Sequence, residues 1–265
     1  MKFIVCVKQV PDTSGKVAVK ADGTMDRSSM AAITNPDDRN AVEAALTLKD
    51  QHPEARVVVI SMGPPPAAGM LRELLAMGCD EAVLISGREF GGSDTFATSQ
   101  IIAAAIAHLG LDEEDVIFCG RQAIDGDTAQ VGPEIAEHLN YPQVTYALEA
   151  EAEGDRLKVK KEVEEGAEII GISMPCVVTF TKPAWDPRYP TIKRKMAANR
   201  AEIPTLTAAD LPAIDLTRAG LKGSPTKVKK TFVPQKKTGG VKIREASNED
   251  SARKLFQLLS DSNVI

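Results

Sequence analysis

The chain has 265 residues, 43% of them hydrophobic, which is enough to bury a sizeable core as one large domain or as one domain with an extension. Its net charge of −5 and isoelectric point near 5.4 argue against general affinity for nucleic acids. Because the chain has no run of about 18 apolar residues and begins without a targeting pattern, we expect a soluble, cytoplasmic protein with no membrane insertion.

Cysteine and histidine positions do not favour a metal centre. The cysteines form no CxxC pair and lie among apolar residues or beside turns, which favours buried free thiols in a reducing compartment: Cys6, Cys79, Cys119 and Cys176. Glu134 and His138 are four residues apart on a predicted helix, but a solvated helix end is the favoured interpretation over a pair of metal ligands. We therefore predict no metal site.

Short apolar runs alternate with helical segments in the first half of the chain. The pattern predicts strands at residues 2–8, 56–61, 80–86 and 115–119. It predicts helices at residues 68–77, 95–109 and 134–139, and a small hairpin at 16–26. A further helix opens at Asn35-Pro36, since Asn is a favoured N-cap and Asp37 and Asp38 complement the helix dipole. Such alternation implies a parallel sheet with right-handed crossovers.

From Gln143 the pattern changes to strands that are joined by tight turns. Segments at residues 145–151, 156–163, 167–173 and 176–180 are interpreted as hairpins, so an antiparallel portion is expected to extend the sheet. The predicted fold class is therefore α/β: a Rossmann-like parallel sheet, extended by antiparallel strands and followed by a C-terminal arm.

The arm is predicted to begin after Lys182, where prolines and lysines interrupt a stretch with few apolar runs. We divide the chain into an α/β domain, 1–182, and an arm, 183–265, in which only residues 248–260 form an amphipathic helix. Because the arm cannot hold a core alone, it should lie across its own domain or a partner chain. Its single aromatic residue between Tyr189 and Phe256 is Phe232, so protein docking is favoured over a stacking platform for nucleic acid.

The stretch GRQAIDGDTAQVGP, residues 120–133, is the main candidate site. It lies between a predicted strand and a predicted helix, where an α/β sheet places anionic ligands. Thr128 is a plausible N-cap, and Gln130 and Val131 would offer first-turn amides to a phosphate. A plain structural connection is the alternative. Asp125 and Asp127 could form an acid/base pair, but binding ribose or shaping the turn fits them at least as well, since no nucleophile accompanies them.

A second candidate is the segment Gly91-Gly92-Ser93-Asp94-Thr95, which also precedes a helix. It is either an ordinary N-cap or a second contact point for a long, phosphate-bearing cofactor.

Several motifs together resemble the beta (small) subunit of electron-transfer flavoproteins over essentially the whole chain. The motifs are VKQVPD (7–12), NPDDRNAVEAAL (35–46), SMGP (61–64), GRQAIDGDTAQVGP (120–133), VKKEVEEGAEIIGISMPCVVTF (159–180) and RYPTIKRKMAA (188–198). The resemblance implies an adenine-nucleotide alpha-hydrolase-like fold and a heterodimer with an alpha subunit, around which the C-terminal arm wraps. In ordinary members the beta subunit binds AMP structurally, while the redox-active FAD lies mostly on the alpha subunit.

The resemblance also implies which residues contact the nucleotide. They are Cys6, Asn35, Pro36, Asp37, Asp38, Met62, Ala123, Ile124, Asp125, Gly126, Asp127, Thr128, Ala129, Gln130, Val131 and Gly132. Arg121 is a further candidate as a cation near a flavin or pyrophosphate, although a surface salt bridge is equally compatible with its position. Ile192 lies in a segment that resembles the loop that docks acyl-CoA dehydrogenases.

The chain departs from ordinary members at Asp125-Gly126-Asp127, where they carry three acidic residues, and in the segment GGSDTFATS, 91–99. Gly126 removes one side chain and one charge, which allows closer backbone approach to a pyrophosphate. These features resemble the electron-bifurcating members, whose beta subunit binds a second FAD in place of AMP. There NADH reduces that flavin, and electrons pass to ferredoxin or flavodoxin and, through the alpha-bound FAD, to an acyl-CoA dehydrogenase. Thr95 and Thr98 would then contact the flavin side.

Two other functions remain open from the sequence. In one, bound AMP only stabilises the heterodimer and the chain is a scaffold. In the other, the chain is a nucleotide-sensing or ATP-hydrolysing α/β protein, which should bind Mg-ATP as a monomer; the arm-like tail argues against it.

Overall fold

The computed structural model describes residues 1–12, 31–229 and 239–265. The hairpin predicted at residues 16–26 lies outside them. The chain divides into two compact units, Met1–Lys229 and Lys230–Ile265. The first holds the sheet, and the second holds one helix, α7 (Asn248–Asp261), none of whose residues is buried.

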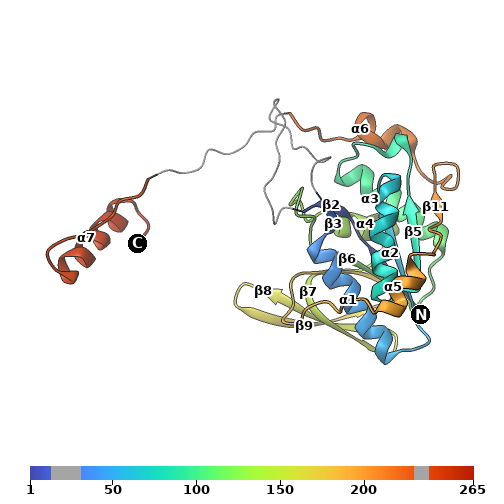
Figure 1. The fold of residues 1–265 in the computed structure, drawn as a ribbon, viewed down its shortest axis with the longest axis horizontal. Coiled ribbons are helices and arrows are strands. Elements are labelled where there is room, and N and C mark those ends of the chain that lie inside the picture. The colour runs from blue at the N-terminus through green and yellow to red at the C-terminus, as the bar shows by residue number, and fades with distance from the viewer. Residues whose placement is uncertain (13–30, 230–238) are drawn as a thin grey trace. The chain divides into compact units, whose positions relative to one another are not determined.

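A nine-stranded sheet forms the centre of the first unit, in the order β11-β5-β4-β1-β6-β10-β7-β8-β9 (Figure 1). Its seven parallel strands are β1 (Lys2–Cys6), β4 (Arg56–Met62), β5 (Glu81–Ile85), β6 (Val116–Gly120), β7 (Gln143–Glu153), β10 (Cys176–Phe180) and β11 (Thr205–Leu206). The parallel sheet predicted from the alternating pattern is therefore confirmed. A separate antiparallel pair joins β2 (Gln9–Pro11) to β3 (Ala32–Thr34).

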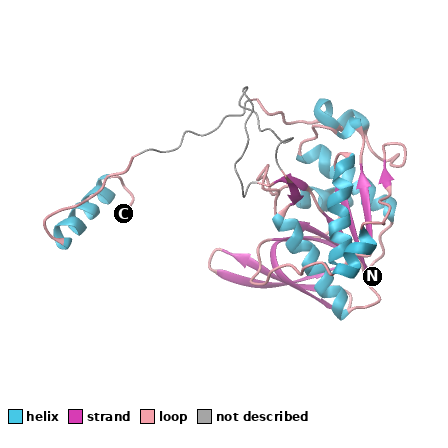
Figure 2. Ribbon diagram, viewed as in Figure 1, coloured by secondary structure: helices cyan, strands magenta, loops and turns pink. Residues whose placement is uncertain are grey.

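Helices cover both faces of the sheet (Figure 2). Two apolar clusters separate along β1, because Phe3 and Val5 point to one face while Ile4 and Cys6 point to the other. The first cluster includes α1 (Pro36–Gln51) and α2 (Ala68–Met77), and the second includes α3 (Thr95–Leu109) and α4 (Val131–Leu139). Strands that are buried on both faces explain why the sequence shows continuous apolar runs there.

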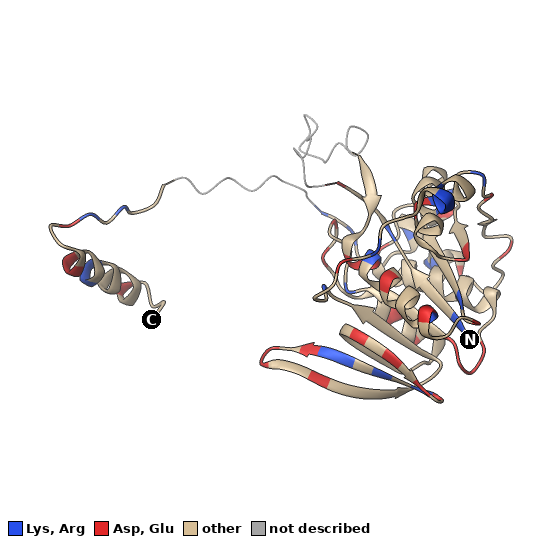
Figure 3. Ribbon diagram, turned by 60° about the horizontal axis from the view of Figure 1, so that its bottom comes forward, with Lys and Arg blue, Asp and Glu red and all other residues tan. Residues whose placement is uncertain are grey.

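The antiparallel extension consists of β7, β8 (Arg156–Val163) and β9 (Gly166–Ser173). On it, Lys160 pairs with Glu149, and Lys158 pairs with Glu151 and Glu153, which gives the alternating charges seen in Figure 3. The expectation that residues 176–180 belong to this antiparallel portion is wrong. That segment, β10, inserts between β6 and β7 and runs parallel to both. All five of its residues are buried, as in a central parallel strand.

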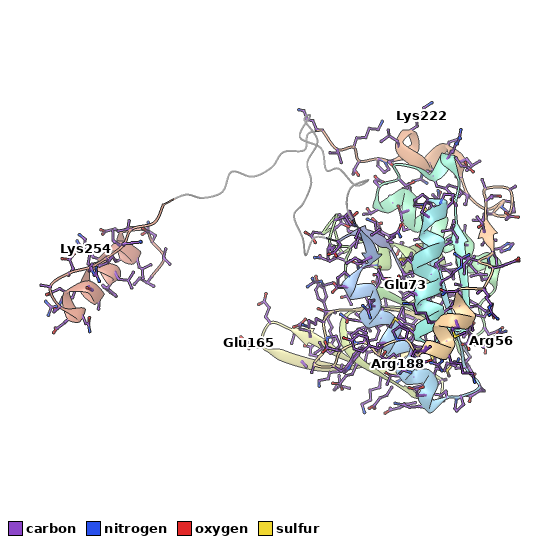
Figure 4. All side chains as sticks on the ribbon, viewed as in Figure 1. Arg56, Glu73, Glu165, Arg188, Lys222 and Lys254 are labelled. Atoms are coloured by element: carbon purple, nitrogen blue, oxygen red, sulfur yellow. The ribbon has the colours of Figure 1, made fainter. Side chains whose placement is uncertain are left out.

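Much of the segment after Lys182 belongs to the first unit and packs on residues 1–182. Arg188, labelled in Figure 4, donates to the buried Glu43 from both its backbone N–H and its Nε. Its guanidinium also donates to Asp50 on α1. Strand β11 joins the sheet beside β5, and Leu211 and Ile214 enter the second apolar cluster. Two short helices follow β4 and β5, η2 (Pro65–Ala67) and η3 (Arg88–Phe90), and the later segment adds α5 (Ile192–Ala198), η4 (Leu216–Arg218) and α6 (Gly220–Gly223). The compact unit thus runs past the boundary expected at 182/183, while the wrapping role of the arm stays a prediction.

Candidate nucleotide-binding site

The sheet reverses its direction of growth between β1 and β6. From β1 the chain moves outward through β4 and β5, and it then returns to the other side of β1 at β6. The carboxyl ends of strands at such a reversal form the usual ligand crevice of an open α/β sheet. The loop after β6, residues 121–130, and the N-terminal end of α1 meet at this edge, which is where the sequence predicted a site.

Asn35 ties that loop to α1. Its side-chain Nδ2 donates to Gln122 O at 2.7 Å, and its Oδ1 accepts from the N–H of Ile124 at 3.1 Å. Asn35 is at the N-cap position of α1, but its side chain makes no capping bond. The predicted N-cap position of Asn35 is therefore confirmed, but both polar atoms of its side chain bond to the neighbouring loop instead of capping the helix.

Asp38 lies beneath the same loop. Its Oδ2 accepts the Lys8 N–H at 2.7 Å, and Gly120 packs so closely on it that an added Cβ would lie 2.2 Å from Asp38 Oδ1. Burial raises the pKa of Asp38 to about 7, although hydrogen bonds from Asn35 and the Lys8 N–H oppose the change. Asp38 is thus a buried side chain that supports the loop from below.

Two charged contacts hold the two ends of the 121–125 segment. The Lys8 ammonium lies 2.6 Å from Asp125 Oδ1, and Arg121 Nε lies 3.3 Å from Asp37 Oδ2. The side-chain Nε–H of Arg121 makes no hydrogen bond within the described residues, although its charge lies beside that carboxylate. Partial burial raises the pKa of Asp37, with the Arg121 charge opposing it. Arg121 therefore pairs with a carboxylate at the site, and not with one on a remote surface.

The second half of the loop turns through left-handed backbone. Asp127 has φ 50° and Ala129 has φ 53°, and Gln122 Nε2 donates to Asp127 Oδ1 at 2.8 Å. Helix α4 then begins at Val131 with Gln130 as its N-cap residue. The expected N-cap at Thr128 is wrong, since the left-handed Ala129 keeps Thr128 outside the helix. Within the described residues, the backbone N–H groups of Thr128, Ala129 and Gln130 donate no hydrogen bond.

The two loop glycines differ in their surroundings. A Cβ at Gly132 would lie 2.5 Å from Thr179 Cγ2, so this glycine lets α4 pack on β10. At Gly126 a Cβ would meet no described atom within 4 Å, and φ is not positive there. Protein packing therefore requires glycine at 132 and not at 126.

Apolar side chains line the sheet below the loop. Cys6 and Cys119 are neighbours on β1 and β6, and both are buried free thiols. The Cys119 thiol, together with burial, raises the pKa of Cys6 well above its ordinary value. Met62 ends β4, half-buried against the second apolar cluster. Pro36, the first residue of α1, is exposed.

The segment at 91–94, just before α3, mainly binds residues 220–226 of the later chain. Asp94 caps α3 by accepting the Ala97 N–H, and its other oxygen accepts from both the N–H and the hydroxyl of Thr226. Ser93 Oγ accepts the Gly220 N–H at 2.9 Å. Thr95 instead faces α4, where its hydroxyl lies 3.2 Å from Glu134 Oε1 and 3.4 Å from Gln130 Oε1. Thr98 is half-buried one turn further along α3.

Four buried side-chain atoms in the described part of the chain lack a hydrogen-bond partner: Arg39 Nε, Ser61 Oγ, Arg121 Nε and Glu134 Oε2. Their residues lie in the first turns of α1 and α4, near the end of β4 and just after β6, all along this edge. Unpartnered buried polar atoms are costly, so their concentration here favours a ligand that supplies the missing partners. Sequence reasoning missed Arg39, Ser61 and Glu134 as site candidates, because their unpartnered state follows from packing and no local pattern reveals it.

Ile192 is not part of this group. It is 82% exposed on α5, which contacts α2, and Arg194 of α5 donates to Met77 O at the end of α2. Because α2 follows β4 and runs back along the sheet, its C-terminal end lies at the amino ends of the strands, opposite the candidate site. Across the described residues, no cluster of three or more His, Cys, Asp or Glu could hold a metal ion. Nor does any helix of the described chain have the length and apolar character to cross a membrane.

Comparison with known proteins gives consistent matches. The family model of the electron transfer flavoprotein domain matches residues 22–211. The chain is 53% identical over 269 residues to the acryloyl-CoA reductase electron transfer subunit gamma of Anaerotignum propionicum, with all of both chains covered. It is 49% identical to the electron transfer flavoprotein subunit beta of Clostridium acetobutylicum and 43% identical to the caffeyl-CoA reductase-Etf complex subunit CarD of Acetobacterium woodii, again over the full length of each.

Proposed function

The chain belongs to the electron transfer flavoprotein family as a beta-type subunit, and on that premise we propose that its nucleotide site holds FAD and takes electrons from NADH. In this proposal the chain forms a heterodimer with an alpha subunit. Electrons pass from the beta site to ferredoxin or flavodoxin and, through an alpha-bound FAD, to an acyl-CoA dehydrogenase. When bound, FAD supplies the exchange between two-electron hydride transfer and one-electron steps.

The observation that carries the proposal is the set of unbonded donors beside an open glycine. The N–H groups of Thr128, Ala129 and Gln130 have no acceptor in the described chain, and they precede the positive end of the α4 dipole. Gly126 leaves the approach to the preceding turn free of a side chain. An anionic diphosphate fits such a surface.

The chain's own residues position the ligand and shield it. Asn35 fixes the loop through Gln122 and Ile124, and Arg121 brings a cation whose Nε still has a hydrogen to donate. Cys6 and Met62 present apolar surface suited to an adenine ring. Thr95, with Glu134 across from it, adds polar groups beside the loop that would serve the flavin half of FAD, which AMP lacks.

The names of two relatives support the choice of electron acceptor. One is described as an electron transfer subunit of acryloyl-CoA reductase and another as a subunit of a caffeyl-CoA reductase-Etf complex. Both names concern CoA-ester redox chemistry, which is the chemistry of the proposed dehydrogenase partner.

The proposal is tested by counting nucleotides in the heterodimer. The chain is co-purified with its alpha subunit, the complex is denatured, and released FAD and AMP are quantified by chromatography. We expect two FAD and negligible AMP per heterodimer, together with reduction of the flavin by NADH. One FAD with one AMP would refute FAD at the beta site and leave the chain as the structural half of a single-flavin carrier.

A further inference from the structure

Glu134 and Thr95 meet where α3 and α4 pack together at the carboxyl edge of the sheet. Thr95 is the first residue of α3, and Glu134 is in the first turn of α4, four residues after Gln130. Their contact, 3.2 Å between Thr95 Oγ1 and Glu134 Oε1, brings a carboxylate to the border of the nucleotide loop.

The cluster of Thr95, Gln130 and Glu134 has fewer hydrogen-bond donors than acceptors. Thr95 has one hydroxyl hydrogen, yet two oxygens lie within its reach, Glu134 Oε1 at 3.2 Å and Gln130 Oε1 at 3.4 Å. Glu134 Oε2 is shielded from solvent and accepts no hydrogen bond from any described residue. Ser99 Oγ nearby donates to Phe96 O instead, and the exposed Gln130 can bond to water. Glu134 Oε2 is therefore the oxygen that still needs a donor.

Nearby charges do not supply that donor. The Arg218 guanidinium lies over the Phe96 ring, 4.4 Å from its centroid. The His138 ring packs against the same ring in an edge-to-face arrangement, with the two centroids 5.5 Å apart. Partial burial raises the pKa of Glu134, against the hydroxyls of Thr95 and Ser99; the Asp94 charge raises it further, and the His138 charge opposes this. The carboxylate is thus desolvated without an ion pair, the state in which it gains most from an external donor.

These contacts also decide which part of a ligand can approach. A phosphate oxygen is an acceptor with negative charge, so it would be repelled by Glu134, whereas the unbonded N–H groups at 128–130 suit it. We propose that Glu134, held by Thr95, binds the uncharged, hydrogen-bond-donating part of the dinucleotide, which is its polyol chain or a ring N–H. This inference rests on the proposed function, and it separates the phosphate-binding part of the loop from a donor-binding part between α3 and α4.

The test compares two nucleotides in the alpha–beta complex. The beta site is stripped and then titrated by calorimetry with FAD and, separately, with AMP, which lacks the polyol chain and the flavin ring. In Glu134→Gln the affinity for FAD should fall about tenfold, as for the loss of one hydrogen bond to a charged group, while the affinity for AMP changes less than about twofold. The matched control is Glu137→Gln, the same change at an exposed position of α4, which should alter neither affinity.

Thr95→Val gives a second variant of nearly unchanged size, in case Glu134→Gln perturbs the fold. It removes the hydroxyl that holds the carboxylate, so it should also weaken FAD binding selectively. Equal losses for FAD and AMP would overturn the inference, since they would assign Glu134 to loop structure or to the nucleoside phosphate. Unchanged FAD affinity would overturn it as well. Wild-type complex that takes only AMP would overturn the proposed function, and this inference with it, before any variant is made.

Discussion

At the scale of single residues, Asn35 joins the loop at 121–130 to the start of α1. It is fully buried, and its side chain satisfies two backbone groups of the loop at once. A buried backbone group without a partner costs about 1–3 kcal/mol. The residue therefore links the stability of the first unit to the conformation of the 121–130 loop.

We expect Asn35→Ala to lower the free energy of unfolding by about 2 kcal/mol and to reduce the nucleotide content of the purified heterodimer. Asn40→Ala is the matched control, because Asn40 is a buried Asn in α1. Its one side-chain hydrogen bond within the described residues, to Thr181 O, is long at 3.4 Å. It should cost about 1 kcal/mol or less and leave the nucleotide content unchanged. Urea denaturation and chromatography measure both quantities, and equal losses of nucleotide in the two variants would contradict the role given to Asn35.

Asp38 gives the protein a defined pH dependence. Its pKa is about 7 in the folded chain against an ordinary value of 3.8, so the folded state holds the proton more tightly than the unfolded state. Its contribution to stability is therefore fully present below about pH 4, is lost as the pH rises, and levels off above about pH 7. In Asp38→Asn this loss is absent, so the stability of the variant relative to wild type should rise by up to about 4 kcal/mol between pH 4 and pH 8. Urea denaturation at several pH values measures it; a constant difference would mean that Asp38 does not titrate in this window.

Gly126 offers a test of ligand approach that protein packing does not obscure. A Cβ there meets no described atom within 4 Å, so Gly126→Glu should leave the melting temperature nearly unchanged. Because it places a side chain and a negative charge beside the proposed diphosphate, FAD content of the beta site should fall at least tenfold. Gly171→Glu, at an exposed position of β9 with equally open space, is the control and should retain FAD. Full FAD content in Gly126→Glu would place the phosphates elsewhere.

At the scale of elements, the N-terminal end of α3 anchors the segment 215–226. Asp94 holds Thr226, Ser93 holds Gly220, and the Leu221 N–H donates to Gly91 O. Partial burial opposes ionisation of Asp94, but hydrogen bonds from Ala97 and Thr226 outweigh it and lower its pKa. The anchor is therefore charged at neutral pH and weakens only in acid, as the pH falls through that lowered pKa.

Asp94→Ala should release this anchor while the sheet stays intact. We expect amide hydrogen exchange in a peptide covering residues 215–229 to accelerate about tenfold, because the acceptor for the Thr226 N–H is lost. Ser247→Ala removes a comparable N-cap from α7 and should leave that peptide unchanged. Unaltered exchange in Asp94→Ala would show that the other contacts hold the segment alone.

Some of these elements could be predicted from the sequence, and others could not. Apolar runs such as residues 56–61 and 116–119 identified buried parallel strands, because burial on both faces leaves a direct signature. The order of the strands leaves no such signature in the sequence. Residues 176–180 look locally like the strands before them, and only tertiary pairing places β10 between β6 and β7. The two-residue strand β11 is too short to show a period. At the site, the position of the loop was predictable, whereas the left-handed Ala129 and the unpartnered Glu134 depend on packing.

At the scale of the whole molecule, residues 239–265 of the second unit present apolar side chains and bury none of them. On α7, Leu255 is 49% and Phe256 is 65% exposed, so the helix has an apolar face that its own unit does not cover. In the proposed heterodimer the alpha subunit covers that face.

Removing residues 230–265 should therefore leave the urea midpoint of the first unit unchanged and abolish co-purification with the alpha subunit. A full-length variant with Leu255→Ser and Phe256→Ser keeps the arm but loses its apolar face, and it should also fail to co-purify. Size-exclusion chromatography of co-expressed chains measures this. A truncated chain that still forms the heterodimer would assign the main contact to the first unit.

The insertion of β10 has a consequence for how the chain is made. Cys176 pairs with Val116, sixty residues earlier, and the Phe180 carbonyl accepts the Arg121 N–H at 2.7 Å. A ribosome therefore delivers β6 and the nucleotide loop well before the strand that completes their edge, and β7, β8 and β9 emerge in the interval. Until β10 arrives, the side of β6 opposite β1 is an unpaired strand edge, open to wrong partners. The nascent chain thus cannot complete the strand pairing beside the 121–130 loop during synthesis of the first two-thirds of its length. If that loop binds FAD as proposed, binding must follow the arrival of β10.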